Sequence, residues 1–108
     1  FINARTDLFL KRAPETHDTA LLDEAIERAL AFADAGASGF FAPRLGDLRL
    51  VEKLVKASPI PVNAIAFPGG PSRTEWANAG IARISHGPFP HRSLMKQLEE
   101  AARAAISG

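Results

Sequence analysis

A guanidinium, an amide and a carboxylate lie within five positions near the start of the chain, in the sequence INARTDLF. Asn3 and Arg5 fall on one face of an expected strand, and Arg5 lies at the end of that strand. A guanidinium held in one orientation binds a carboxylate through two parallel hydrogen bonds. Arg5 is therefore the main candidate for substrate binding and catalysis, and Asn3 is a second candidate for substrate binding.

Three residues farther along the chain are also candidates for a site. Asn63 is a candidate substrate contact on the polar face of a later strand. Arg44 follows another expected strand and is either a second anion contact or a solvated loop arginine. His86 follows the last expected strand and is a candidate general acid or base, because an unperturbed imidazole titrates near neutral pH. The alternative for His86 is a loop histidine bonded to the backbone. His17 and His91 are predicted to be exposed.

Composition limits the classes of function. The chain has 108 residues, of which 46% are hydrophobic and 23% charged, as in a globular domain or a piece of one. A net charge of +1 gives no basic field for nucleic acid, and no apolar run has the length of a bilayer span. The absence of cysteine excludes disulfides and fits a reducing compartment. We therefore expect neither a nucleic-acid nor a membrane partner, and a cytoplasmic location.

The elements that position these residues are four strands that alternate with four helices. Strands are predicted over residues 1–5, 38–42, 61–66 and 81–85. The first helix begins after Asp18 or Thr19 and stops at Gly36, and the second begins near Asp47. The third begins with a capping box at 72–75 and ends at Gly80. The sequence FPGGPS leads into this helix and is predicted to form a tight turn, with a cradle of backbone N–H groups for an anion as the alternative. The fourth covers about 90–107 and carries an apolar stripe.

The alternation of residue types within the strands favours a barrel. Strands joined through helices pair in parallel, and their spacing fits both a (β/α)8 barrel and an open doubly wound sheet. A doubly wound sheet has apolar residues on both faces. Here one face carries Asn3, Arg5, Asn63, Arg83 and Ser85. The predicted fold is therefore α/β, with these polar groups inside the barrel; a buried network in which they only satisfy one another is the alternative.

Four βα units make half a barrel, which leaves two sheet edges and an inner face uncovered. The chain also begins with Phe1 in the middle of a strand. We therefore expect it to be the second half of a longer barrel, after processing or truncation. A half-barrel that pairs with itself is the alternative.

Four motifs then point to a family. INARTD, AGASGFFAPRLGD, PVNAIAFPGGPS and GIARISHGP follow one another over nearly the whole chain. Together they closely resemble the C-terminal half of the isocitrate lyase/phosphoenolpyruvate mutase family, particularly its methylisocitrate lyase-like branch. The resemblance implies a (β/α)8 barrel, of which residues 1–108 form strands five to eight with their helices. It also implies Mg²⁺, the cleavage or formation of C–C or P–C bonds in oxo or hydroxy acids, and tetramers that exchange the last barrel helix.

The resemblance gives roles to few residues of this chain. Arg5 stands where the family's arginine contacts the substrate carboxylate or phosphonate. Asn3, Thr6 and Asp7 belong to the same motif and are expected to hold Arg5 in place. The family's Mg²⁺ ligands and its cysteine-bearing loop belong to the first half of the barrel, so the resemblance implies no metal ligand here. Asp7 and Asp47 match no metal position of the family.

Two departures from the family pattern leave the substrate open. The lyases have a glutamate at the slot that falls near Pro43 here, and Arg44 stands next to it. Their asparagine on the following strand falls near Ile65, whereas Asn63 lies two residues earlier. Hydrolysis or decarboxylation of a short oxo acid is therefore an alternative to cleavage of an isocitrate-type substrate.

Two functions remain at this point. In the first, the complete protein is a Mg²⁺-dependent lyase, or a related hydrolase or decarboxylase, that acts on a small carboxylate. It would assemble as a homo-oligomer through the last helix or through the missing half of the barrel. In the second, the chain is a truncated or degenerate barrel fragment that has no catalytic activity and acts as an oligomerising or structural module.

Overall fold

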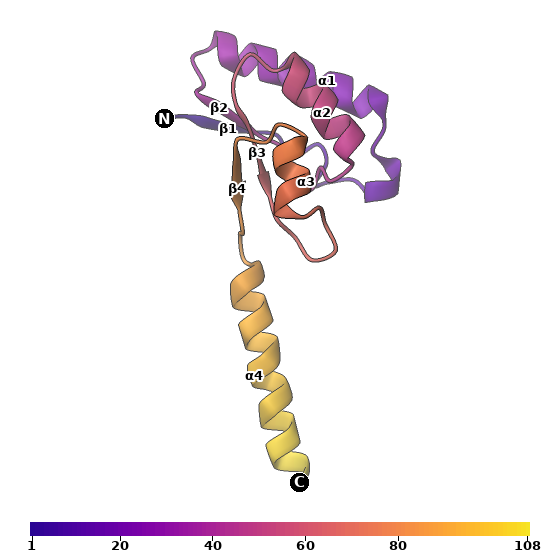
Figure 1. Ribbon diagram of the computed structural model, residues 1–108, viewed down its shortest axis with the longest axis vertical. Helices are drawn as coiled ribbons and strands as arrows, with labels where there is room; N and C mark the ends of the chain where they lie inside the picture. Colours follow the sequence, from indigo (N-terminus) through magenta and orange to yellow (C-terminus); the bar gives the residue numbers. More distant parts are fainter.

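The computed structural model describes all 108 residues and contains one four-stranded sheet (Figure 1). The strands lie side by side in sequence order, and every neighbouring pair is parallel. They are β1 (Asn3–Arg5), β2 (Gly39–Phe41), β3 (Val62–Ile65) and β4 (Arg83–Ser85). All four predicted strands are confirmed, each within its predicted range.

A helix follows each strand, so the chain consists of four βα units. The helices are α1 (Thr19–Asp34), α2 (Leu48–Ala57), α3 (Arg73–Asn78) and α4 (Phe89–Ser107). The predicted starts of the first three helices are confirmed by side-chain caps, whereas α4 has no side-chain cap. The carboxylate of Asp18 accepts a hydrogen bond from the backbone N–H of Leu21 at 2.9 Å. The short 3₁₀ helix η1 (Pro14–Thr16), which precedes α1, was not predicted.

The third helix begins and ends as the sequence predicts. Ser72 and Glu75 form a reciprocal capping box, in which each side chain bonds the other residue's backbone N–H. Gly80 follows the helix at a φ of 90°, in the left-handed region that favours glycine. The turn before the helix is also confirmed, since the N–H of Gly70 donates to the carbonyl of Phe67 at 3.0 Å.

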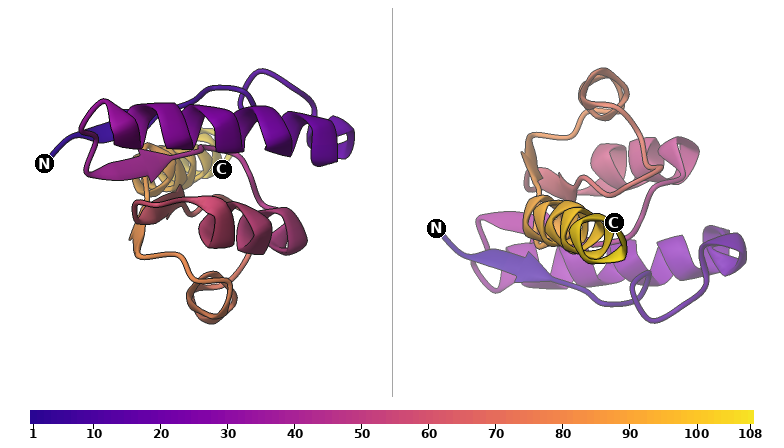
Figure 2. Two further views of the ribbon diagram at one scale, coloured as in Figure 1. Left: turned by 90° about the horizontal axis from the view of Figure 1, so that it is seen from above. Right: turned by 90° about the horizontal axis from the view of Figure 1, so that it is seen from below.

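Helices α1, α2 and α3 cover one face of the sheet (Figure 2). Phe40, Val62 and Ala64 of the strands form one buried cluster with apolar side chains of all three helices. Trp76 of α3 belongs to this cluster and is 1% exposed. A doubly wound sheet has helices on both faces and a reversal in strand order. The observed order and one-sided cover are instead those of half a (β/α)8 barrel.

The last helix extends away from this body. Figure 1 shows α4 continuing along the long axis of the molecule, which measures 60 Å against 31 and 25 Å for the other two axes. Every residue from Pro90 to Gly108 is exposed. The exposed side chains include the large apolar ones, Leu94, Met95, Leu98 and Ile106. The apolar stripe predicted for this helix therefore has no packing partner within the chain. No helix combines the length and the hydropathy of a membrane span.

Candidate functional site

The uncovered face of the sheet carries a polar network that joins all four strands. The side-chain amides of Asn3 and Asn63 bond each other reciprocally, with N···O distances of 3.2 and 2.7 Å. Asn63 also donates to the carbonyl of Phe40 at 3.0 Å and accepts from Arg83 Nη2 at 3.5 Å. Three members of the predicted polar face, Asn3, Asn63 and Arg83, are therefore joined by hydrogen bonds. Arg5 and Ser85 bond other partners, and Arg83 is exposed, so the alternative of a buried network that satisfies itself describes only part of this face.

These bonds use all the hydrogen-bonding capacity of the Asn63 side chain. A primary amide has two N–H donors and two oxygen lone pairs. Both donors of Asn63 and both lone pairs have partners within the chain, and the residue is 6% exposed. Asn3 keeps one donor and one lone pair free. The predicted substrate contacts of Asn3 and Asn63 remain predictions, and in this arrangement Asn3 is the one with capacity to spare.

The amide pair forms because the strand between its two members lacks a side chain at the crossing point. Gly39 of β2 lies beside Asn3 in the parallel register. A Cβ atom built on Gly39 would come within 3.2 Å of Asn3 Oδ1 and within 2.9 Å of the exposed ring of Phe1. No local pattern singles out Gly39, because its role depends on the side chains that neighbouring strands place next to it.

We expect Gly39→Ala to lower the free energy of unfolding by about 1 kcal/mol, because the added methyl would lie 3.2 Å from Asn3 Oδ1 and the bonded amide would have to shift to admit it. Urea unfolding measures this change. The same substitution in an Asn3→Ala background, where the displaced amide is already absent, is expected to have a smaller effect. Equal losses in both backgrounds would show that the methyl acts elsewhere, for instance on Phe1.

Arg5 lies at the carboxyl end of β1, where the sequence placed it. Its side chain is 51% exposed, and its Nε donates to Asp7 Oδ1 at 2.6 Å. The hydrogen bond from Arg5 lowers the pKa of the Asp7 carboxyl, and the Asp7 carboxylate raises the pKa of Arg5. Both groups therefore stay charged at neutral pH. Because Asp7 takes only the Nε edge, the two Nη groups remain available for a second, bidentate partner.

The residue after Arg5 is held by a contact that sequence reasoning missed. Thr6 is 1% exposed, and its hydroxyl accepts a hydrogen bond from Arg28 Nη1 at 3.1 Å. Arg28 belongs to α1 and also bonds Glu24 one turn earlier, at 3.0 Å. The i,i+4 spacing of Glu24 and Arg28 predicts the ion pair. No local pattern predicts the contact with Thr6, because 22 residues separate the partners.

Arg44 lies in the loop between β2 and α2, in a backbone conformation that is uncommon for residues other than glycine. Its φ is 73°, and its guanidinium carbon lies 5.3 Å from the centre of the Phe67 ring. Together with His17 and Asp47, it lines a cavity of about 260 Å³. None of Asn3, Arg5 and Asn63 lines that cavity. The predicted role of Arg44 as a second anion contact therefore remains a prediction.

The strain at Arg44 gives a paired stability test. Arg44→Gly and Arg44→Ala both remove the contact with Phe67, but only alanine keeps a Cβ atom at positive φ. We expect the glycine variant to unfold with a free energy about 1 kcal/mol higher than the alanine variant. Urea unfolding of the two variants side by side is the measurement. An alanine variant as stable as the glycine variant would mean that the loop relaxes to negative φ without cost.

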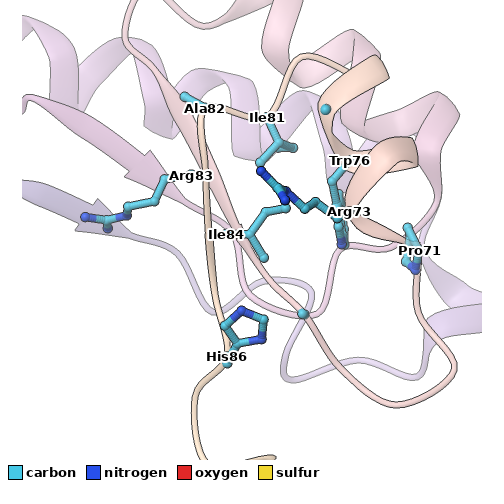
Figure 3. A pocket seen from close by; sticks show the side chains of 10 residues that line it. Pro71, Arg73, Trp76, Ile81, Ala82, Arg83, Ile84 and His86 are labelled. Atoms are coloured by element: carbon cyan, nitrogen blue, oxygen red, sulfur yellow. The ribbon is translucent and has the colours of Figure 1, made fainter.

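His86 is exposed and lies beyond β4, at a cavity of about 420 Å³ (Figure 3). The cavity is bordered by Trp76 and Ile84, among other residues of α3 and β4. In Figure 3 the Arg83 side chain extends to the opposite side of the strand from Trp76. Arg83 is nevertheless part of the lining of this cavity. No hydrogen bond joins His86 to Asn3, Asn63 or Arg83, and its predicted catalytic role remains a prediction.

One loop histidine departs from expectation and another agrees with it. His17 was predicted to be exposed, which is wrong: it is half-buried, because the loop after β1 folds back over it. Its Nε2 lies 2.9 Å from the carbonyl oxygen of Phe9, and the two rings meet edge to face at 5.1 Å. His91 is exposed, as predicted.

The carboxylates of this chain do not fit a Mg²⁺ site. No group of three or more His, Cys, Asp or Glu side chains is placed to hold a metal ion. Asp7 is paired with Arg5, and Asp47 bonds both the side chain and the backbone N–H of Arg49. Mg²⁺ requires near-octahedral oxygen ligands, and these two carboxylates are separately engaged.

Comparison with known proteins agrees with this architecture. A crystal structure from Burkholderia cenocepacia, described as a "putative phosphonomutase", is 50% identical and superposes with a TM-score of 0.88 over 100% of this chain and 42% of that one. Another from the same organism, described as a "putative lyase/mutase", is 30% identical, with a TM-score of 0.79 over 94% of this chain and 35% of that one.

Curated relatives give the same picture. Two uncharacterized proteins of Mycobacterium tuberculosis are each 35% identical over 100% of this chain and 40% of their own length. The chain thus spans about two fifths of the length of these relatives. The family profile of phosphoenolpyruvate phosphomutase matches residues 1–106. With this match over nearly its full length, the chain belongs to the phosphoenolpyruvate phosphomutase family.

Proposed function

We propose that this chain supplies four βα units to the barrel of an enzyme that cleaves or forms a C–C or P–C bond in a small oxo or hydroxy acid. Family membership supports an enzyme of the mutase and lyase type. The observation that carries the proposal is Arg5, which stands at the carboxyl end of β1 with both Nη groups unpaired. Active sites of (β/α)8 barrels lie at this end of the strands.

In the proposed reaction, Arg5 binds the carboxylate or phosphonate of the substrate. The Nη edge of the guanidinium matches the two oxygens of such an anion and fixes its orientation. Asp7 holds the Nε edge, so the side chain is oriented before substrate arrives. Asn3, two residues before Arg5 in β1, has one free N–H and would be a further contact for the substrate. Arg44 and His86 line two separate cavities, neither of which includes Arg5 or Asn3. Either residue would therefore contact the substrate only if the substrate were longer or if its loop moved.

Mg²⁺ belongs to the proposal only as a property implied by the family. Its chemistry would be the stabilisation of an enolate-like oxygen. Because the carboxylates here do not fit a metal site, its ligands would have to come from barrel strands outside residues 1–108. No role of Arg5 or Asn3 described above depends on the ion.

We also propose that α4 binds a second copy of the chain. Its large apolar side chains are 49–88% exposed, which is unusual for a helix of this length with nothing packed on it. The cavity between α3 and β4 offers an apolar surface of the matching kind, with Trp76, Ile81 and Ile84 in its lining.

Calorimetric titration of oxalate, an enolate mimic, tests the proposal in the complete polypeptide that carries this chain. With Mg²⁺ present we expect heat of binding, and we expect most of it to be lost when Arg5 is replaced by lysine. The absence of any heat would remove the enzymatic proposal. The exposed apolar stripe of α4 would then favour the second function, a non-catalytic oligomerising module.

A further inference from the structure

We propose that Arg28 on α1 is a positioning residue for Arg5, and that it acts through the hydroxyl of Thr6. The proposal rests on the proposed function, in which Arg5 binds the substrate anion. It adds a residue from a different element, 22 positions farther along the chain.

The first step concerns the point at which the chain leaves the sheet. The N–H of Thr6 donates to the carbonyl of Phe41 at 3.0 Å, and this is the last ladder bond after β1. Beyond it, Lys11 N–H to Asp7 O is a turn bond of the following loop. Thr6 therefore lies where the regular strand stops, directly between the binding candidate Arg5 and its partner Asp7. A shift of Thr6 moves both of them.

The second step concerns what holds the Thr6 side chain. Its hydroxyl accepts from Arg28 Nη1 at 3.1 Å and from the backbone N–H of Leu8 at 3.4 Å, which uses both of its lone pairs. The side chain is fully buried, so no water can replace these donors.

The third step concerns the guanidinium of Arg28 itself. One nitrogen bonds Thr6 and another bonds Glu24 at 3.0 Å, so the planar group is held at two points. A lysine ammonium in its place offers one flexible donor atom for two partners. Glu24, Arg28 and Thr6 thus form a continuous series of hydrogen bonds from the surface of α1 to the backbone beside Arg5.

The experiment measures oxalate affinity in the complete polypeptide with Mg²⁺, by calorimetry, for Arg28→Met, Thr6→Val and both together. Each single substitution is expected to weaken binding roughly 3- to 30-fold, and the double substitution no more than either alone, because they remove one contact. Thr6→Ser keeps the hydroxyl and is expected to retain wild-type affinity. Circular dichroism establishes that each variant is folded before it is titrated.

Arg49→Met is the matched control. Arg49 also pairs with a nearby carboxylate, that of Asp47 at 3.1 Å, but it has no contact with Thr6 and its side chain is 87% exposed. It is expected to bind oxalate as the wild type does. If the Arg28 and Thr6 variants lose stability but keep wild-type affinity, or if their effects add, the contact is structural only and the proposal is wrong.

Arg5→Lys in the same titration separates this inference from the proposed function. Wild-type affinity in Arg5→Lys would overturn the proposed function itself. Lost affinity in Arg5→Lys, together with unchanged affinity in folded Arg28→Met and Thr6→Val, would overturn only the positioning role. Should Thr6→Val fail to fold, the comparison of Arg28→Met with Arg28→Lys and Arg49→Met decides in its place, since a positioning role requires that both Arg28 variants lose affinity.

Discussion

Replacing Arg5 by lysine in the complete polypeptide is expected to weaken oxalate binding and to lower kcat/KM, each roughly 10- to 150-fold. The range follows from the loss of one charge-assisted hydrogen bond, which contributes about 1.5–3 kcal/mol. Lysine keeps the positive charge, so an effect of this size reports geometry: a single ammonium cannot bond Asp7 and hold both oxygens of an anion at once.

The effect is measured by calorimetry with oxalate and by steady-state kinetics with any short oxo acid that the polypeptide turns over. Arg49→Lys is the control, because Arg49 pairs with a carboxylate two positions away, as Arg5 does, but lies at the outer start of α2. We expect it to bind oxalate with unchanged affinity. Unchanged kinetics in Arg5→Lys would remove Arg5 from the site.

The protonation state of Asp7 sets the pH range in which the Arg5→Lys variant can be compared directly with the wild type. The hydrogen bond from Arg5 lowers the pKa of the Asp7 carboxyl below its ordinary value, so the carboxylate persists at every pH above that range. The Arg5–Asp7 contact is lost only as the pH falls through this lowered value. Titrations at neutral pH therefore compare variants in one protonation state of the pair.

The parts of the fold that the sequence predicted are those with a local cause. Asp18 and the capping box of Ser72 and Glu75 mark helix starts because their side chains bond N–H groups two or three residues away. Alternation of polar and apolar residues placed Asn3, Asn63 and Arg83 on one face, and the structure joins them. Periodicity and capping act over a few residues, so they can be read from one sequence.

The parts that the sequence did not predict depend on distant neighbours. The bond from Arg28 to Thr6 joins two elements, and an arginine on a helix surface looks the same with or without it. Arg44 adopts a positive φ although it is not glycine, and its guanidinium lies over the Phe67 ring from the next loop. His17 was predicted to be exposed because no pattern near it in the sequence indicates its contact with the carbonyl of Phe9, eight residues earlier. Each of these features requires the tertiary arrangement.

The packing of α4 is the clearest case in which a sequence pattern is compatible with two arrangements. Its apolar residues recur at helical spacing whether they pack on their own barrel or on another subunit, so the periodicity does not distinguish the two. The structure shows the helix clear of its own body, with every residue from Pro90 onward exposed. What remains to be tested is the surface that covers the stripe.

Leu98→Asp is expected to abolish self-association of the complete polypeptide at micromolar concentration. Leu98 lies at the centre of the stripe, between Leu94 and Ala102, and its side chain is 62% exposed in the single chain. Full burial of an exposed leucine contributes about 1.5–3 kcal/mol, Leu98 is 62% exposed, and a symmetric dimer contains the substitution twice, so roughly 2–4 kcal/mol of association free energy is lost. The buried carboxylate adds a further penalty.

Sedimentation velocity over a range of concentrations measures the change, and Ser93→Asp is its matched control. That variant introduces the same charge into the same helix, but on the polar face, where Gln97 bonds the serine hydroxyl. A wild-type polypeptide that stays monomeric would contradict the proposal, as would equal weakening by both variants, which would assign the effect to charge instead of burial. Dissociation by Leu98→Asp alone would show that the stripe is an interface. It would also explain why a helix with so many large apolar side chains has none of them covered within its own chain.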